Sequence, residues 1–541
     1  MPSHPKSHRV PHLTIACALM ALCHVPVHAA TPQAQTTLGA LQGETRDGVH
    51  QFLGIAYAAP PTGPLRWKAP QTAESWPGVR QATRTGPACP QLRGQYSGTA
   101  ATATSEDCLT LNVYAPATPS STPRPVLVWL HPGSLTMGAG SDYDGKALAR
   151  QADAVVVTVN YRLGALGFLS TMELQQEAPA SNYALQDQQQ ALRWVRDNIA
   201  AFGGDTRRVT LAGNSAGAAS TCAHLVSPAS AGLFQRAIMQ SGPCIRLGSK
   251  TLEQARAEAD RFASQVNCPS GAGQLACLRS RPADELVAAA GDGLDALQTA
   301  NPWGPVIDGQ IIPAKITSMI RDGAIHKVPI LLGTTADEGR FFVAYSFHQQ
   351  RGRAMTADDY TSAAAVMTGS AFAGSTSRSL YTAARYGSID LAMSALMTDA
   401  GFACPMLTDA SRLSRHVPVH VYEFTDTQAP APADPHFVLG AYHTGELQYL
   451  FGAPVFATQL TSTPTPAQNA MAATIVQHWA AFMASGDPNH PLLPKWHRFN
   501  ELTMPIMNLA PGQTGLQAWA AFGQKHRCLT WSLLLALSGQ N

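Results

Sequence analysis

Residues 209–220 read Val-Thr-Leu-Ala-Gly-Asn-Ser-Ala-Gly-Ala-Ala-Ser, and this stretch decides the fold. The apolar run 209–212 predicts a buried strand, and the small residues from Ala218 onward predict the start of a helix. Between them lies Gly213-Asn214-Ser215-Ala216-Gly217, whose glycines permit a turn tight enough to lift the serine hydroxyl clear of the backbone. The amino terminus of the helix favours negative charge at this turn. The context therefore indicates that Ser215 is a nucleophile.

Other apolar runs along the chain have the same character as residues 209–212. Runs without alternating polar residues are typical of strands that are covered on both faces. They occupy residues 126–130, 154–159, 328–332 and 419–424. Residues 183–202 have an apolar face with helical period, and residues 470–484 form a second clear helix before Gly486. Strands that alternate with helices predict an α/β protein with a mostly parallel central sheet and helices on both faces.

The chain shows no internal repeat and no linker that would divide it. Two segments, residues 251–301 and 354–399, are rich in alanine and serine and have helical patterns, which predicts helical cap insertions over the sheet. Because α/β folds often carry long insertions on one sheet, we predict a single domain over residues 30–541.

The first residues have the pattern of a signal peptide. Lys6 and Arg9 precede an apolar stretch at residues 13–22, and Val27-His28-Ala29 suits cleavage before Ala30. We therefore expect residues 1–29 to be removed and the protein to be secreted or periplasmic. This apolar stretch is too short to span a bilayer. The late apolar run 529–537 is also too short, and we expect a packed terminal helix there and no membrane span.

The charge balance excludes a nucleic-acid-binding function. Lys6 and Arg9 belong to the predicted leader, and removing them from the 37 basic residues leaves 35, equal to the 35 acidic residues. A neutral mature chain has no basic footprint for nucleic acid. Hydrophobic residues make up 45% of the chain and charged residues 13%, which supports a large core and argues against disorder.

The cysteines agree with an exported protein. Cys89 and Cys108 bracket a polar loop, and Cys268 and Cys277 bracket a short loop that contains glycine, so both pairs have the spacing of surface staples.

The remaining cysteines are harder to assign. Cys404 and Cys528 are too far apart in the sequence for their spacing to decide whether they pair. We expect Cys222 and Cys244 to be buried small apolar side chains without a disulfide.

A neutral serine is a poor nucleophile, and it needs a base that is itself oriented by an acid. In a fold that places G-x-S-x-G between a strand and a helix, the acid and then the histidine follow the serine in the chain. Glu338 follows the run 328–332, and His443 follows the run 419–424. The carboxyl ends of parallel strands meet at one edge of a sheet. We therefore predict an α/β-hydrolase fold with Ser215, Glu338 and His443 as its triad.

Each partner of the serine has an alternative nearby. Asp337 is the alternative acid, and its other role is a hydrogen bond within the local turn. His436 is the alternative base, and its other role is that of a solvated loop residue. The glycine-flanked loop around His443, Gly440-Ala-Tyr-His-Thr-Gly, favours His443 as the base.

An oxyanion hole is predicted after the run 126–130. The stretch Trp-Leu-His-Pro-Gly-Ser at residues 129–134 occupies the place of the HGGG-type loop of such enzymes. The backbone N–H groups of Gly133, Ser134 and Ala216 are the predicted donors, and each such donor is typically worth about 3 kcal/mol of transition-state stabilisation. A plain Gly/Pro turn is the alternative.

Further motifs identify a family. They are Phe-Leu-Gly-Ile-Ala-Tyr-Ala at residues 52–58, Ser-Glu-Asp-Cys-Leu-Thr-Leu-Asn-Val at residues 105–113, and the long stretch 186–215. Together with Ser215 they resemble the type-B carboxylesterase/lipase family, which includes the cholinesterases and secreted bacterial carboxylesterases, over nearly all the mature chain. The resemblance implies the same triad, a small-molecule ester substrate, and no metal or organic cofactor.

The resemblance also implies a disulfide framework. Two disulfides, Cys89–Cys108 and Cys268–Cys277, follow from it. Phe402-x-Cys404-Pro405 and Cys528-x-x-Trp531 resemble a third pair, Cys404–Cys528, of the cholinesterases.

This chain departs from the family at three places. Asn214 stands where the family usually has glutamate, which removes a carboxylate near the serine. Pro132-Gly133-Ser134 replaces a triple glycine, so we expect strained backbone at Ser134 and a narrower acyl space. The loop between Cys89 and Cys108 has Tyr96 as its only aromatic residue and lacks the tryptophan that cholinesterases use for choline, so a choline ester is not expected.

The predicted activity is ester hydrolysis through an acyl-enzyme on Ser215. A catalytically inactive binding module is one alternative, which the complete triad disfavours. An amidase or carbamate hydrolase with the same residues is another. Arg340, two residues after Glu338, is a candidate to pair with an acidic ester, and its alternative role is a structural ion pair. Nothing in the sequence indicates the oligomeric state.

Overall fold

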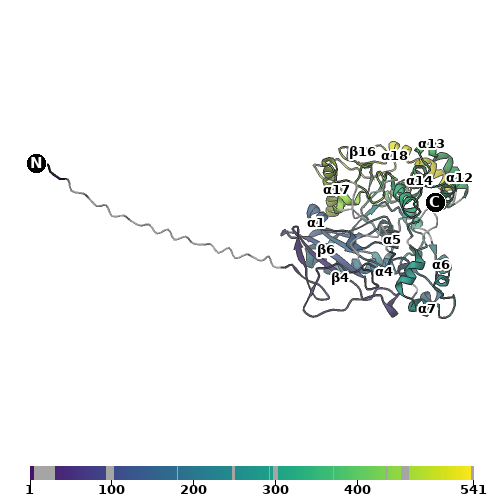
Figure 1. Cartoon of the computed structure of the whole chain (residues 1–541), viewed down its shortest axis with the longest axis horizontal. Coiled ribbons are helices and arrows are strands. Elements are labelled where there is room, and N and C mark those ends of the chain that lie inside the picture. Colours follow the sequence, from purple (N-terminus) through teal and green to yellow (C-terminus); the bar gives the residue numbers. More distant parts are fainter. Residues whose placement is uncertain are drawn as a thin grey trace. The chain divides into compact units, whose positions relative to one another are not determined.

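The structure is a computed structural model of the 541-residue chain. It describes residues 1–4, 31–92, 103–178, 181–246, 250–291, 293–295, 302–369, 371–432, 437–452 and 462–537. The chain separates into two compact units, Met1–Thr31 and Pro32–Asn541, and the second contains the fold (Figure 1). The predicted signal peptide lies mostly outside the described residues, as do Tyr96 and His436.

A mixed eleven-stranded sheet organises the second unit, and its strands are labelled in part in Figure 1. Their order is β16 (Gly515–Gln517), β15 (Ile506–Leu509), β14 (Val419–Phe424), β13 (Ile330–Thr335), β10 (Arg236–Gln240), β9 (Gly204–Asn214), β7 (Arg124–Leu130), β8 (Val155–Val159), β6 (Thr110–Pro116), β4 (Val49–Ala56) and β3 (Glu44–Arg46). All pairs from β8 to β15 are parallel, and the pairs outside them are antiparallel. The mostly parallel α/β sheet expected from the sequence is confirmed.

The apolar runs form the buried centre of this sheet. Every residue of β7, β8, β13 and β14 is buried, as expected for strands with helices on both faces. The strand expected at 328–332 begins two residues later, because Pro329 has no N–H for the sheet ladder. The strand expected at 209–212 is longer than its apolar core and extends over all of β9.

The helices pack on the sheet through their apolar faces. The helix expected at 183–202 is α4 (Tyr183–Asn198), followed by a 3-10 turn, η3 (Ile199–Phe202). Helix α5 (Ala216–Val226) contacts β9 and β10, and α17 (Pro466–Ser485) contacts β7 and β9. Thr465 caps α17 by accepting a hydrogen bond from Gln468 N, and Gly486 ends it in the left-handed conformation.

The two segments predicted as cap insertions are helical. The first contains α6 (Leu252–Gln265), α7 (Gln274–Ser280) and α8 (Ala283–Ala290). The second contains α11 (Ala357–Thr368), α12 (Ala371–Leu380), α13 (Ala383–Tyr386) and α14 (Ile389–Met397).

One described stretch, Ile389–Ser414, has the length and apolar character of a membrane span, but 72% of its apolar 18-residue window is buried inside the protein, as in a core helix. It comprises α14, the π-helix η7 (Thr398–Ala403) and α15 (Cys404–Ser414). The terminal helix α19 (Cys528–Leu537) packs through Cys528 and Trp531 and leaves Leu529 and Leu533 exposed. The expectation of a packed terminal helix is therefore right for one face only.

The structure contains four disulfides, and one of them corrects the sequence prediction. Three join Cys89 to Cys108, Cys268 to Cys277, and Cys404 to Cys528. The fourth joins Cys222 to Cys244, which we expected to be unpaired. Both side chains are fully buried as predicted. They pair because the chain leaves α5, runs through β10 and returns against α5 at η5 (Cys244–Arg246), which brings their Cα atoms to 5.7 Å.

Candidate active site

Ser215 lies in a sharp turn between β9 and α5. Its backbone has φ +53° and ψ −117°, a strained conformation that few side-chain-bearing residues adopt. A Cβ on Gly213 would lie 2.3 Å from the carbonyl carbon of Gly217, and a Cβ on Gly217 would lie 2.0 Å from the oxygen of Leu130. Both glycines are thus required for the close approach of strand, turn and helix. The Ser215 N–H donates to the carbonyl of Gln240 at 2.8 Å.

Glu338 and His443 meet as the sequence predicted, from the segments that follow β13 and β14. His443 Nδ1 and Glu338 Oε2 are 2.5 Å apart, and both side chains are buried. The other oxygen of Glu338 accepts hydrogen bonds from Thr334 Oγ1 and Thr335 N, each at 2.7 Å. Burial opposes ionisation of Glu338, but the adjacent His443 and these hydrogen bonds outweigh it and lower the pKa of Glu338. The carboxylate therefore stays ionised and orients the imidazole.

Ser215 and His443 line the same narrow pocket, which has a volume of about 10 Å³. His443 Nε2 is buried and has no hydrogen-bond partner among the described residues. This is the nitrogen that must accept a proton, because Nδ1 is paired with Glu338.

The predicted oxyanion loop lines this pocket through Pro132, Gly133 and Ser134. Gly133 has φ +118°, and a Cβ on it would lie 2.2 Å from the oxygen of Met137. Ser134 has φ +53° and Leu135 has φ +63°, so the strain expected at Ser134 is present and continues into the next residue. The third predicted donor, Ala216, is the first residue of α5.

Aromatic rings surround the imidazole of His443. The ring centroids of Phe341, Phe342 and Phe402 lie 5.8, 4.9 and 5.1 Å from that of His443. Leu294 and Met137 complete the apolar lining. Among the described lining residues, His443 is the only ionisable side chain, so the pocket offers no charge to a substrate beyond the predicted catalytic groups.

Asp337 and Arg340 have structural roles. Asp337 accepts a hydrogen bond from Ala441 N at 2.9 Å, and its other oxygen lies 3.1 Å from Arg340 Nε. Arg340 also donates to the carbonyl of Val438 at 3.0 Å. It lines a separate cavity of about 210 Å³ and not the catalytic pocket. Arg340 therefore forms the structural ion pair that we weighed against pairing with an acidic ester.

A buried polar cluster behind the triad was missed in the sequence. Glu446 Oε1 accepts hydrogen bonds from Asn214 Nδ2 at 3.1 Å and from Gln240 Nε2 at 3.2 Å. Burial and the nearby Glu338 raise the pKa of Glu446 to about 8. The only sequence feature that could have indicated Glu446 is its position three residues after His443.

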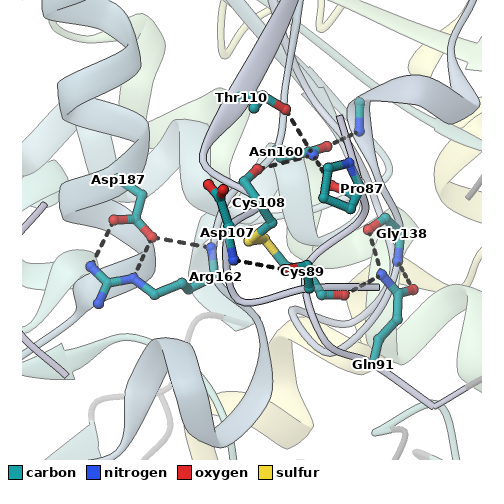
Figure 2. Close-up of a disulfide and its surroundings, with 12 residues drawn as sticks. Pro87, Cys89, Gln91, Asp107, Cys108, Thr110, Gly138, Asn160, Arg162 and Asp187 are labelled. Atoms are coloured by element: carbon teal, nitrogen blue, oxygen red, sulfur yellow. Dashed lines mark hydrogen bonds and ion pairs between the residues drawn. A yellow bond between two sulfur atoms is a disulfide. The ribbon is translucent and has the colours of Figure 1, made fainter. Parts of the chain in front are cut away.

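Figure 2 shows the Cys89–Cys108 disulfide and the hydrogen bonds around it, which reach Gly138 in the segment after the predicted oxyanion loop. Gln91, two residues after Cys89, accepts a hydrogen bond from Gly138 N at 2.8 Å and donates to the Gly138 carbonyl at 3.0 Å. Asn160 donates to the Cys108 carbonyl at 3.1 Å and accepts from Gly140 N at 2.8 Å. The segment that follows the oxyanion loop is thus fixed to the disulfide from both sides.

The same view contains a buried ion pair. Arg162 and Asp187 form a bidentate pair with distances of 2.8 and 2.7 Å.

Within the described part of the chain, no three His, Cys, Asp or Glu side chains are grouped to hold a metal ion.

Comparison with known proteins identifies the family. The profile of the Carboxylesterase family matches residues 30–531. Para-nitrobenzyl esterase of Bacillus subtilis (strain 168) is 36% identical over 477 residues, with 86% of this chain and 92% of that protein covered. Carboxylesterase 3 of Homo sapiens is 33% identical, with coverage of 91% and 90%. Neuroligin-2 of Homo sapiens is 32% identical, and the match covers 92% of this chain but 64% of that protein.

Solved structures agree with these relatives. A thermophilic PNB esterase superimposes with a TM-score of 0.78 at 34% identity and covers 91% of this chain and 99% of its own. A second PNB esterase gives 0.76 at 35% identity, with the same coverage. The α/β-hydrolase fold predicted from the sequence is thereby confirmed. The chain belongs to the carboxylesterase family, and it is a carboxylic ester hydrolase.

Proposed function

We propose that the protein hydrolyses uncharged carboxylic esters in two steps, through an acyl-enzyme on Ser215. The observation that carries this proposal is the 2.5 Å contact between Glu338 and His443, with the other nitrogen of His443 unpaired on the pocket that also contains Ser215. Glu338 fixes the imidazole so that Nε2 faces the serine and stabilises the imidazolium that forms.

In the first step, His443 Nε2 takes the hydroxyl proton of Ser215 as the oxygen attacks the ester carbonyl. The N–H groups of Gly133, Ser134 and Ala216 stabilise the negative oxygen of the tetrahedral intermediate. His443 then gives the proton to the departing alcohol, which leaves the acyl group on Ser215. In the second step, water attacks that acyl group while His443 Nε2 takes its proton, and the bond between the acyl group and Ser215 breaks as His443 returns the proton to the serine oxygen and the acid is released.

The pocket favours a small, uncharged acyl group. Its volume of about 10 Å³ holds about one water molecule, so the lining side chains of Phe341, Phe342 and Leu294 must move to admit an acyl group, and they move least for a small one. No charged side chain among the described lining residues would pair with an ionic substrate. Burying an unpaired charge in such a site costs several kcal/mol, so we expect an ionic ester to be a poor substrate.

Turnover of p-nitrophenyl acetate and p-nitrophenyl butyrate tests the proposal, together with labelling by an organophosphate. We expect turnover of both esters and one label per chain on Ser215. Parallel assay of p-nitroacetanilide measures amide hydrolysis, and comparable amide and ester turnover would favour the amidase alternative. A purified protein that neither turns over ester nor accepts label would favour the binding-module alternative, which the similarity to neuroligin-2 keeps open.

We further propose that residues 1–29 are a signal peptide and that residues 30–541 act as one exported domain. Four disulfides are the pattern of an oxidising compartment and support export. The intact mass of the exported protein tests this: we expect a chain that begins at Ala30 with all eight remaining cysteines oxidised. A chain that retains residues 1–29, or one with free thiols, would contradict the proposal.

A further inference from the structure

One buried carboxyl group contacts both residues that hold the backbone of Ser215. Asn214 directly precedes Ser215. The backbone carbonyl of Gln240 accepts a 2.8 Å hydrogen bond from the Ser215 N–H. The side-chain amides of Asn214 and Gln240 both donate to Glu446 Oε1, at 3.1 and 3.2 Å. Glu446 lies three residues after His443, in the segment that positions the catalytic base. The carboxyl therefore joins the base loop to the nucleophile turn and to the end of β10.

Among the described residues, no cation is paired with Glu446. Its two side-chain hydrogen-bond partners are neutral amides, and the structure shows no ion pair to it within the described residues. The ionisable groups that act on it are the carboxylate of Glu338 and the phenols of Tyr143 and Tyr422. Burial and a neighbouring carboxylate both favour the protonated acid, consistent with the raised pKa of Glu446.

A protonated Glu446 also supplies a hydrogen-bond donor to this cluster. Glu446 Oε2, Asn214 Oδ1 and Gln240 Oε1 are buried and have no partner among the described residues. Buried acceptors without a donor are costly. A proton on Glu446 Oε2 converts one of these three acceptors into a donor, which reduces the number left without a partner.

We propose that Glu446 is a positioning residue that, as a neutral acid, fixes the loop carrying His443 to the turn carrying Ser215, and that Asn214 permits this link without adding a second buried charge. This inference rests on the proposed function of the triad. A carboxylate at position 214 would face Glu446 and add negative charge near His443, which favours the imidazolium. The base would then be protonated, and inactive, up to a higher pH.

The test compares wild type with Glu446→Gln, Glu446→Ala and Asn214→Asp. The measurements are kcat, KM and the pH profile of kcat/KM from pH 5 to 9, with p-nitrophenyl acetate and with active sites counted by organophosphate label. We expect Glu446→Ala to lower kcat about tenfold or more with KM within about twofold, as for loss of geometry around a catalytic group. Glu446→Gln, a neutral isostere, should recover kcat to within about threefold of wild type.

The pH profile separates positioning from simple loss of structure. Asn214→Asp should move the acid limb upward by about half a unit or more, because a charge near His443 favours its protonated form. In Glu446→Gln the acid limb should stay in place, because Glu446 is neutral there. Glu446→Gln as impaired as Glu446→Ala, or an unmoved limb in Asn214→Asp, would overturn the inference and leave the triad intact.

Failure of the proposed function itself is distinguishable, because wild type would then show neither turnover nor label on Ser215. If Glu446→Ala does not fold, the pH profiles of the other two variants decide the matter.

Discussion

Two loops on the pocket of Ser215 and His443 each hold a serine at the same positive φ, and they differ in how they support it. Ser215 and Ser134 both have φ +53°. Around Ser215 the chain is so tight that a Cβ on Gly213 would strike the backbone of Gly217 at 2.3 Å. After Ser134 the left-handed conformation continues into Leu135, which is not a glycine either.

The same positive φ serves a different purpose in each loop. The turn at Ser215 must present a side chain, so its own residue cannot be glycine, and the glycines on either side make the conformation possible. The loop at Ser134 is proposed to supply only a main-chain N–H. A glycine at 134 would retain that donor at lower conformational cost. The substitutions below test this distinction, in order of decreasing expected effect on activity or stability.

Ser215→Ala removes the nucleophile and should have the largest effect. We expect kcat for p-nitrophenyl acetate to fall by about 10⁴-fold or more, as for other serine hydrolases that lose their nucleophile. The melting temperature should not fall, because alanine keeps the Cβ and removes only the hydroxyl. Residual activity within tenfold of wild type would mean that another group attacks the ester.

Glu338→Gln leaves the shape of the site and removes the charge that orients His443. We expect a loss of about 10³-fold in kcat, since a neutral amide does not stabilise the imidazolium. The control is Asp337→Asn, which changes the neighbouring carboxyl of the Arg340 pair and should cost far less activity. Equal losses in the two variants would restore Asp337 as the catalytic acid.

The pH dependence of stability gives an independent check on Glu338. Its pKa is lowered in the folded protein from an unfolded value of 4.5, so its ionisation contributes stability above pH 4.5 that is lost as the pH falls. Thermal unfolding should therefore show a steeper decline below that pH in wild type than in Glu338→Gln. Parallel curves for the two proteins would contradict the lowered pKa.

Gly217→Ala tests the packing at the nucleophile turn. A Cβ there would lie 2.0 Å from the oxygen of Leu130, so β7 and α5 must move apart. We expect a loss of about 3 kcal/mol in the free energy of unfolding, the upper range for overpacking, and a fall in kcat. Urea unfolding measures the first, with Gly515→Ala as control for a glycine without a positive φ whose Cβ position is unobstructed. Similar losses in both variants would show that the contact with Leu130 is not the cause.

Ser134→Gly should have the smallest effect, and of opposite sign for stability. Relief of the φ +53° conformation should raise the free energy of unfolding by up to about 1 kcal/mol. We expect kcat to stay within about threefold of wild type, because the N–H is retained. A large loss of activity would show that the Ser134 hydroxyl takes part in the reaction.

The sequence predicted what depends on local pattern and chain order. β9, the turn at Ser215 and α5 follow from one continuous stretch, and Glu338 and His443 follow from the rule that parallel strands present their carboxyl ends at one edge. Long-range contacts were not predictable in this way. Asn214 and Glu446 are 232 residues apart, and nothing local indicates their hydrogen bond.

The same limit explains the correction at Cys222 and Cys244 and the position of Arg340. Cys222 and Cys244 pair because a helix and a later turn pack together, which their spacing alone does not reveal. Arg340 lies two residues from Glu338 in the sequence, but one helical turn directs it to Asp337 and away from the pocket.

Trapping the acyl-enzyme is the direct test of the proposed covalent role of Ser215. Wild-type protein mixed with excess p-nitrophenyl acetate is quenched in acid within the first turnovers and analysed by peptide mass spectrometry. We expect an acetyl group on the peptide that contains Ser215, formed with a burst of p-nitrophenol of one equivalent per active site. Hydrolysis that proceeds with no acetyl group on Ser215 would contradict it.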